Sequence, residues 1–190
     1  MLFRNTERRY GIVAQLLHWV VVALVAIQFA LGITAHNLPF SPTKLGVLAW
    51  HKSFGLLILG LIVLRLGWRL YSPPPTLPAT MPSWQQYAAR LSHGLFYVLL
   101  LTMPLVGWAS SSAANLTVSV FGWFQLPNLT APDKELAKTL VSTHIVMSWI
   151  LLANIVLHAS AALWHHLVNK DDVLRRMLPL SHPTHGDHSR

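Results

Sequence analysis

The chain contains 190 residues, 53% of them hydrophobic and 11% charged, and its mean hydropathy is +0.47. This composition is typical of a membrane protein. A formal net charge of +8 would favour a nucleic-acid partner in a soluble protein. Here the basic residues lie outside the apolar stretches, so membrane topology explains them and no nucleic acid is expected. Cysteine is absent, which excludes disulfides, thiolate-bound metals, cysteine-bound iron–sulfur clusters and covalent c-type haem, whereas histidine occurs 11 times.

Four apolar stretches are each long enough to cross a bilayer, and we predict membrane spans at about residues 11–33, 46–70, 87–110 and 139–169. A short basic arm precedes the first stretch, so a cleaved signal peptide is the rival interpretation of that start. The stretch is too long for a typical signal core and no small-x-small cleavage site follows it. We therefore expect it to be retained as the first span.

The connecting segments have distinct compositions. Residues 34–45 form a loop with two prolines, and five prolines between residues 73 and 82 predict an extended connector. The stretch from 110 to 132 is too broken for another full-length helix, so it is expected to be an outer loop whose aromatic residues Phe121, Trp123 and Phe124 enter the interface. Residues 180–190 form a polar tail that carries His182, His185 and His188.

The distribution of lysine and arginine predicts the orientation of the chain. With four spans, both termini lie on one side of the membrane. That side collects ten basic residues, which are Arg4, Arg8, Arg9, Arg65, Arg69, Arg90, Lys170, Arg175, Arg176 and Arg190. The other side has four, which are Lys44, Lys52, Lys134 and Lys138. By the positive-inside rule, the sequence predicts an all-α, single-domain, four-helix transmembrane bundle (residues 1–190) with both termini in the cytoplasm.

Two histidines of the fourth span share one side of the expected helix. His144 and His158 are 14 residues apart, which corresponds to about four turns less 40° and a rise of about 21 Å. An ionisable ring inside a membrane is costly and usually has a function. Two rings on one stripe, near opposite edges of the bilayer, indicate two stacked sites.

Matching the depths of the histidines gives two pairs. His18 lies near the inner edge of the first span and His51 near the outer edge of the second. The outer pair would be His51 with His144, and the inner pair His18 with His158. Haem iron accepts two axial imidazoles, and helix bundles build such sites from facing helices. For a single membrane histidine an interhelical hydrogen bond is a serious alternative, and His93 shares the inner depth as a rival ligand or quinone contact.

Four segments of the chain resemble the bacterial cytochrome b561 family, and more distantly the di-haem cytochrome subunits of hydrogenases and formate dehydrogenases. They are YGIVAQLLHW in the first span, LAWHKSFGLLILGLIVLRLGWRLYSPPP in the second, AARLSHGLFYVLLLTMPLVGW in the third and THIVMSWILLANIVLHASAALWHHLVNKDDVLRRMLP in the fourth. The resemblance covers about residues 10–179. It implies a multi-pass protein of the bacterial inner membrane that binds two b-type haems. The metal ligands that it implies are His18 with His158 and His51 with His144.

The small bacterial members of this family resemble a superoxide:ubiquinone oxidoreductase. That resemblance implies an enzyme that oxidises superoxide at the periplasmic side and reduces ubiquinone. Lys52, next to a haem ligand, is the candidate residue for steering the superoxide anion. His165 lies seven residues beyond His158 and is the candidate for the quinone end, ahead of His166 and Arg69. Arg65 either neutralises a haem propionate or reaches the lipid headgroups.

Other functions stay open on the sequence alone. The chain could instead relay electrons between the quinone pool and a soluble periplasmic redox partner, or act as a transmembrane ferric or ascorbate-linked reductase. The last alternative is a helical membrane protein without redox function, whose histidines only pack between the helices. It is disfavoured because the histidines of different spans match in depth. Membrane lipid surrounds the bundle in each case, and either a monomer or a homodimer is compatible with the sequence.

Overall fold

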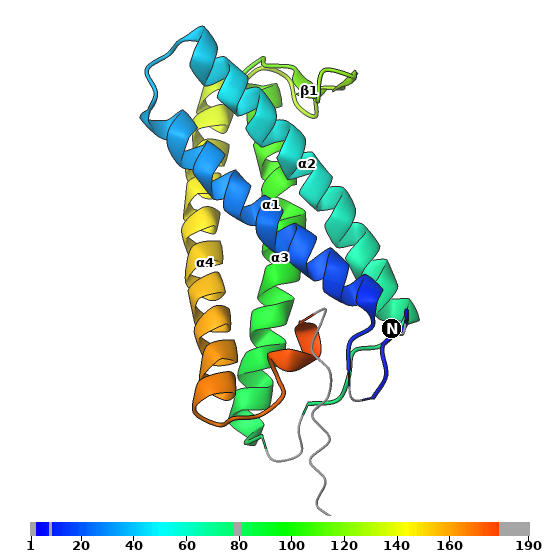
Figure 1. Ribbon diagram of the computed structural model, residues 1–190. Helices are drawn as coiled ribbons and strands as arrows, with labels where there is room; N and C mark the ends of the chain where they lie inside the picture. Colours follow the sequence, from blue (N-terminus) through cyan, green and yellow to red (C-terminus); the bar gives the residue numbers. More distant parts are fainter. Residues whose placement is uncertain (1–2, 8, 78–80, 179–190) are drawn as a thin grey trace, which may run out of the picture.

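The computed structural model describes residues 3–7, 9–77 and 81–178, and its body consists of four long helices (Figure 1). These are α1 (Ile12–Asn37), α2 (Pro42–Tyr71), α3 (Ser83–Ala113) and α4 (Lys134–Leu167). Each is long and apolar enough to cross a membrane. α1 packs against α2, α2 against α3 and α3 against α4. The prediction of a bundle of four membrane-crossing helices is confirmed, whereas the tail histidines His182, His185 and His188 lie outside the described residues.

The helices and the expected spans have different ends, and α2 and α4 begin earlier than expected because polar residues cap them ahead of their apolar stretches. Ser41 caps α2 by accepting a hydrogen bond from the Lys44 amide (3.2 Å), and Pro42 occupies the first helical position. The Asp133 carboxylate caps α4 by accepting from the amides of Glu135 and Leu136 (2.9 and 3.0 Å). Hydropathy therefore marks the part of these two helices that suits lipid, whereas the caps mark where the helices begin.

A β-hairpin occupies the segment that the sequence predicts to be an outer loop. Strands β1 (Val118–Val120) and β2 (Phe124–Leu126) pair antiparallel. Three residues connect the paired Val120 and Phe124. Phe121 and Gly122 both have positive φ (51° and 77°), and the Trp123 amide donates to the Val120 carbonyl (2.9 Å), which closes a tight turn between the strands. The fold is therefore mostly helical rather than helical throughout.

The hairpin is attached to α2 at the end of the bundle that the positive-inside rule predicts to lie outside, which is called the outer end here, and the other end is called the inner end. The buried hydroxyl of Ser53 accepts from the Phe121 amide (2.9 Å), and its single proton is shared between the Ala49 carbonyl of α2 (2.9 Å) and the Ser119 carbonyl of the hairpin (3.2 Å). The ring of Phe121 packs against Trp50 and Phe54 of α2, with centroids 5.9 and 5.5 Å away. Phe121 therefore belongs to an aromatic cluster with two residues of α2, and its position at the membrane interface stays a prediction.

The opposite end of the bundle is closed by the last described segment, residues 170–178, which includes the 3-10 helix η1 (Arg175–Met177). Gln15 of α1 donates to the Arg176 carbonyl (3.1 Å), and the indole of Trp19 donates to the Met177 carbonyl (2.9 Å). The Arg176 guanidinium donates to the Thr76 carbonyl of the connector (2.9 Å). The described start and end of the chain therefore lie at the same end of the bundle (Figure 1).

Candidate functional site

Four histidines face one another in two pairs between the helices. His18 of α1 faces His158 of α4, with ring centroids 6.4 Å apart and ring planes at 69°. His51 of α2 faces His144 of α4, with centroids 6.1 Å apart and planes at 71°. Because α4 is one unbroken helix, its two histidines are separated by a rise of about 21 Å. The structure thus brings together the same two pairs that depth matching gave.

The spacing within each pair fits one iron atom between the rings. Imidazole nitrogens bind transition metals at about 2.0–2.1 Å, and a ring centroid lies about 1.1 Å behind its nitrogen, so two opposed axial rings have centroids about 6.3 Å apart. Both observed distances lie close to this value. The ring of His93 lies only 5.4 Å from His158, which is too close for the two to bind opposite faces of one iron. Geometry therefore favours His18 over His93 as the partner of His158.

The donor set of each pair suits a haem better than a bare metal ion. Among the described residues no group of three or more His, Cys, Asp or Glu side chains could hold a metal ion. Each pair therefore offers two nitrogens, and the remaining coordination positions of iron need a macrocycle with four donors of its own. The residues present fit a b-type haem with two axial histidines.

The outer histidines lie in grooves that glycines create on the neighbouring helices. A Cβ added to Gly32 of α1 would lie 3.3 Å from Cε1 of His51, and one added to Gly107 of α3 would lie 3.5 Å from Cε1 of His144. Nδ1 of each ring is buried without a well-formed hydrogen bond to the described residues. The main chain of Gln28, four residues before Gly32, interacts with the His51 ring. With Nδ1 turned to a neighbouring helix, Nε2 is the nitrogen left for a metal.

A graded alanine series tests this groove. We expect Gly32→Ala to displace the His51 ring and weaken the outer site by about 1–3 kcal/mol, the usual cost of overpacking. Gly107→Ala adds only an ordinary contact (3.5 Å) and should have a smaller effect. Gly46→Ala is the matched control, because nothing lies within 4 Å of the added Cβ. Haem content and low-temperature electron paramagnetic resonance report the outcome, and equal spectra for Gly32→Ala and Gly46→Ala would contradict it.

Basic and phenolic groups surround the inner pair. The Arg65 guanidinium lies 3.0 Å from Nδ1 of His18, and Arg69 lies 5.8 Å from the ring centroid of Tyr97. Within the part of the chain that the structure describes, neither arginine forms an ion pair with an acidic residue. Burial raises the pKa of Tyr10 although Arg69 and Arg65 act to lower it, so this phenol stays neutral. The inner end is therefore cationic and suits an anionic group such as a carboxylate.

The two candidate catalytic residues lie at opposite ends of the bundle. Lys52 follows His51 at the outer end and makes no hydrogen bond or ion pair with residues 3–7, 9–77 and 81–178, whereas Lys44 donates to the Leu38 carbonyl (2.9 Å). His165 is buried in the last turn of α4, and its Nδ1 lies 2.5 Å from the Asp171 carboxylate. Asp171 was not predicted from the sequence. The one feature that marks it there is that Asp171 and Asp172 form an acidic pair within a basic segment.

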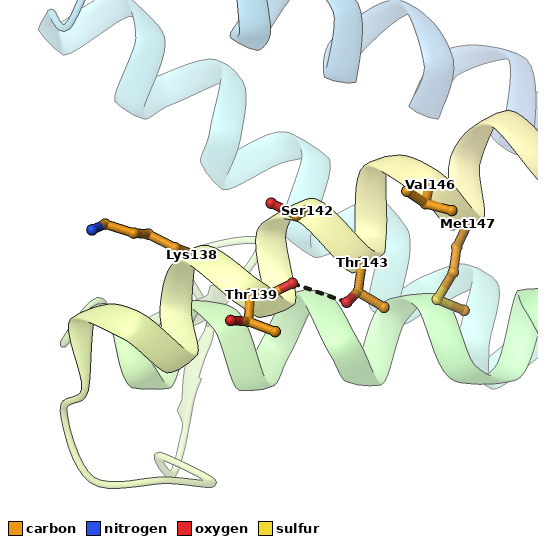
Figure 2. Close-up of a pocket in the computed structure, with 6 residues that line it drawn as sticks. All are labelled: Lys138, Thr139, Ser142, Thr143, Val146 and Met147. Atoms are coloured by element: carbon orange, nitrogen blue, oxygen red, sulfur yellow. Dashed lines mark hydrogen bonds between the residues drawn. The ribbon is translucent and has the colours of Figure 1, made fainter.

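A shallow hollow of about 480 Å³ lies along the first half of α4 (Figure 2). It is lined by Lys138, Thr139, Ser142, Thr143, Val146 and Met147. Ser142 and Val146 lie two residues before and after His144, so both point to the opposite side of the helix. The Thr143 hydroxyl donates to the Thr139 carbonyl (2.9 Å). The hollow therefore lies mainly on the side of α4 that is turned from His144, and none of the four paired histidines lines it.

A bundle of four membrane-crossing helices with facing histidines between them is the architecture of a membrane-embedded b-type cytochrome. The chain matches the family model described as prokaryotic cytochrome b561 over residues 9–180, and it belongs to that family. It is a multi-pass bacterial membrane protein, and the family carries b-type haem and transfers electrons in the membrane.

Three curated relatives are similar over most of their length. "Cytochrome b561 homolog 2" of Escherichia coli (strain K12) is 35% identical over 98% of this chain and 100% of the relative. "Cytochrome b561 homolog 1" of the same strain is 33% identical over 86% of this chain and 93% of the relative. "Probable superoxide oxidase CybB" of Yersinia pestis is 30% identical over 91% of this chain and 97% of the relative.

Proposed function

We propose that this cytochrome binds two b-type haems and carries electrons from superoxide at the periplasmic end to ubiquinone at the cytoplasmic end. The observation that carries the proposal is the pair of opposed histidine sites stacked along α4, with ring spacings of 6.1 and 6.4 Å. A b-type haem at each site supplies reversible one-electron transfer, and two in series connect the faces of the membrane. The Yersinia pestis relative is named a probable superoxide oxidase, which supports superoxide as the electron donor.

The orientation follows from the basic residues. The arm, the proline-rich connector and residues 170–178 meet at one end of the bundle, the end that carries Arg65 and Arg69. The hairpin and the α1–α2 loop lie at the other end (Figure 1). The positive-inside rule assigns the arginine-rich end to the cytoplasm, and therefore the hairpin, Lys52 and the His51/His144 pair to the periplasm.

Each end offers groups that suit its substrate. Superoxide is a small anion, and Lys52 is a cation without a partner among the described residues, next to the proposed haem ligand His51. A local positive charge raises the rate at which an anion arrives. At the inner end, a quinone needs an apolar slot with a proton or hydrogen-bond donor. His165, in the last turn of α4 at that end of the bundle, is the donor that we propose. Arg65, whose guanidinium lies 3.0 Å from Nδ1 of His18, and Arg69, one turn later on α2, suit the propionates of the inner haem.

The test is to mix oxidised, purified protein with a superoxide source under anaerobic conditions and follow the visible spectrum, with and without a short-chain ubiquinone. We expect b-type bands to appear with superoxide and to decay when the quinone is added. Lys52→Gln should slow the first phase by about three- to tenfold and weaken its dependence on ionic strength.

The matched control for that variant is Lys138→Gln. Lys138 already forms an exposed pair with Glu135 (2.7 Å) on α4, so its loss should leave the first phase within about twofold. If the reduced b-type bands do not appear with superoxide but do appear with a reduced quinone, the proposal is contradicted. That result would favour an electron relay to a soluble periplasmic partner, which should then be recovered bound to the protein.

A further inference from the structure

The imidazole of His165 has one nitrogen in contact with a carboxylate and one nitrogen without a hydrogen bond to the described residues. Nδ1 lies 2.5 Å from Oδ2 of Asp171, and the amide nitrogen of Asn169 is a more distant neighbour at 3.3 Å. An ionised carboxylate can only accept a hydrogen bond, so Nδ1 carries the proton of this contact. Nε2 makes no hydrogen bond with any residue that the structure describes. A fixed Nδ1–H with a free Nε2 is how proteins orient a working histidine.

Asp171 is itself held in place from several directions. Its amide donates to the His165 carbonyl (3.1 Å), and its Oδ1 accepts from the Val173 amide (3.0 Å). Lys170 adopts a left-handed conformation (φ 52°), which reverses the chain after α4 and brings the carboxylate back to the ring. One carboxylate oxygen is thus bound to the main chain and the other faces the histidine.

Exposure changes across this pair. The His165 side chain is 10% exposed and the Asp171 side chain 28% exposed. The neighbouring Asp172 is 66% exposed and faces Arg175 at 3.9 Å, away from the histidine. The pair therefore reaches from a buried ring at the inner end of the bundle to a carboxylate in contact with water.

We propose that Asp171 is the positioning residue of the quinone end, and that the His165–Asp171 pair delivers protons from the cytoplasmic side to the reduced quinone. This inference rests on the proposed function. The overall reaction balances as two superoxide anions, one quinone and two protons giving two O2 and one quinol. In each proton step the Nε2–H bond of His165 breaks and an O–H bond forms on a quinone oxygen. Asp171 holds the Nδ1–H throughout, and the ring regains its Nε2 proton from the aqueous phase beside the carboxylate.

The experiment uses the full-length, haem-loaded protein and separates two rates. The first is reduction of the haem bands by superoxide, and the second is their re-oxidation by a short-chain ubiquinone. Asp171→Asn keeps an oxygen that can accept the Nδ1–H and removes only the charge. We expect it to slow re-oxidation by at least about tenfold, with a changed solvent deuterium isotope effect, and to leave the first rate within about twofold. Asp171→Glu should recover part of the loss.

The matched control is Asp172→Asn, which makes the same change one residue away and should alter neither rate. A second readout needs no turnover: in protein with ¹⁵N-labelled histidine, a downfield Nδ1–H resonance should be present in the wild type and in Asp172→Asn and absent in Asp171→Ala.

Three outcomes would overturn the inference. The first is an equal rate of re-oxidation in Asp171→Asn and Asp172→Asn. The second is loss of haem, or of haem reduction by superoxide, in Asp171→Asn, which would show that residues 170–178 have a structural role only. The third is wild-type protein whose haem bands, reduced chemically, are not re-oxidised by ubiquinone. That last result refutes the quinone end as well, whereas failure of superoxide alone refutes the proposed donor and leaves the re-oxidation comparison valid.

Discussion

Replacing His18 by alanine is expected to lower the haem content of the purified protein from about two haems per chain to about one, because the inner iron would lose an axial ligand. The ring of His18 is 6.4 Å from that of His158, the spacing that one iron between them requires. The outer pair shares no residue with this site, so the outer haem should stay bound. The pyridine haemochrome assay and a redox titration with one component in place of two would measure the loss.

His93→Ala is the matched control for this prediction. The His93 ring lies at the same depth on α3, and its centroid is 5.4 Å from that of His158, which is closer than the His18 ring. If the pairing is correct, His93→Ala retains both haems. If His93→Ala loses a haem and His18→Ala does not, the assignment of the inner ligands is wrong.

A second variant guards against simple misfolding. His18→Met replaces one axial ligand by another that haem iron accepts, and histidine–methionine ligation raises the reduction potential. We expect this variant to keep the inner haem with a higher potential. Circular dichroism should show unchanged helix content in all three variants, since the core around Val21, Ile58 and Ile62 is untouched.

The depth of each histidine could be predicted from the sequence because a helix advances by a fixed rise per residue. That is why His51 and His144, which are far apart along the chain, could be placed at one level from their positions within the spans. The rotation of α3 about its own axis is set by packing, so the sequence did not show whether His93 or His18 faces His158 at the right distance.

Two other features depend on local backbone geometry that apolar patterning does not reveal. The hairpin requires positive φ at Phe121 as well as Gly122, and a phenylalanine rarely adopts that conformation. The Asp171 contact requires the left-handed backbone conformation of Lys170, which reverses the chain after α4. In the sequence, the charged segment that follows indicates only membrane topology. In the structure, it returns and covers the inner end of the bundle. The glycine grooves at Gly32 and Gly107 are likewise visible only once the neighbouring helices are in place.

At the inner end, His165 differs from the four paired histidines in a way that suits its proposed role as a proton donor. His165 lies seven residues after His158, about 20° short of two full turns, so it continues the same stripe at the interface. Unlike His51 and His144, whose Nδ1 atoms lack a well-formed hydrogen bond, it has a carboxylate partner. A ring held by a carboxylate and open at Nε2 is suited to proton exchange rather than to a bis-histidine haem.

His165→Ala is therefore expected to leave both haem bands in place and to reduce ubiquinone turnover by about 100-fold or more, the usual contribution of a positioned proton donor. Superoxide should still reduce the haems at the wild-type rate, since the outer end is unchanged. His166→Ala is the matched control, because the next ring lies about 100° around the helix and has no hydrogen bond to Asp171. Stopped-flow spectra with superoxide followed by a short-chain ubiquinone separate the two steps. Unchanged re-oxidation in His165→Ala would show that the quinone takes its protons elsewhere, and a lost haem band would show that the ring supports the inner site instead.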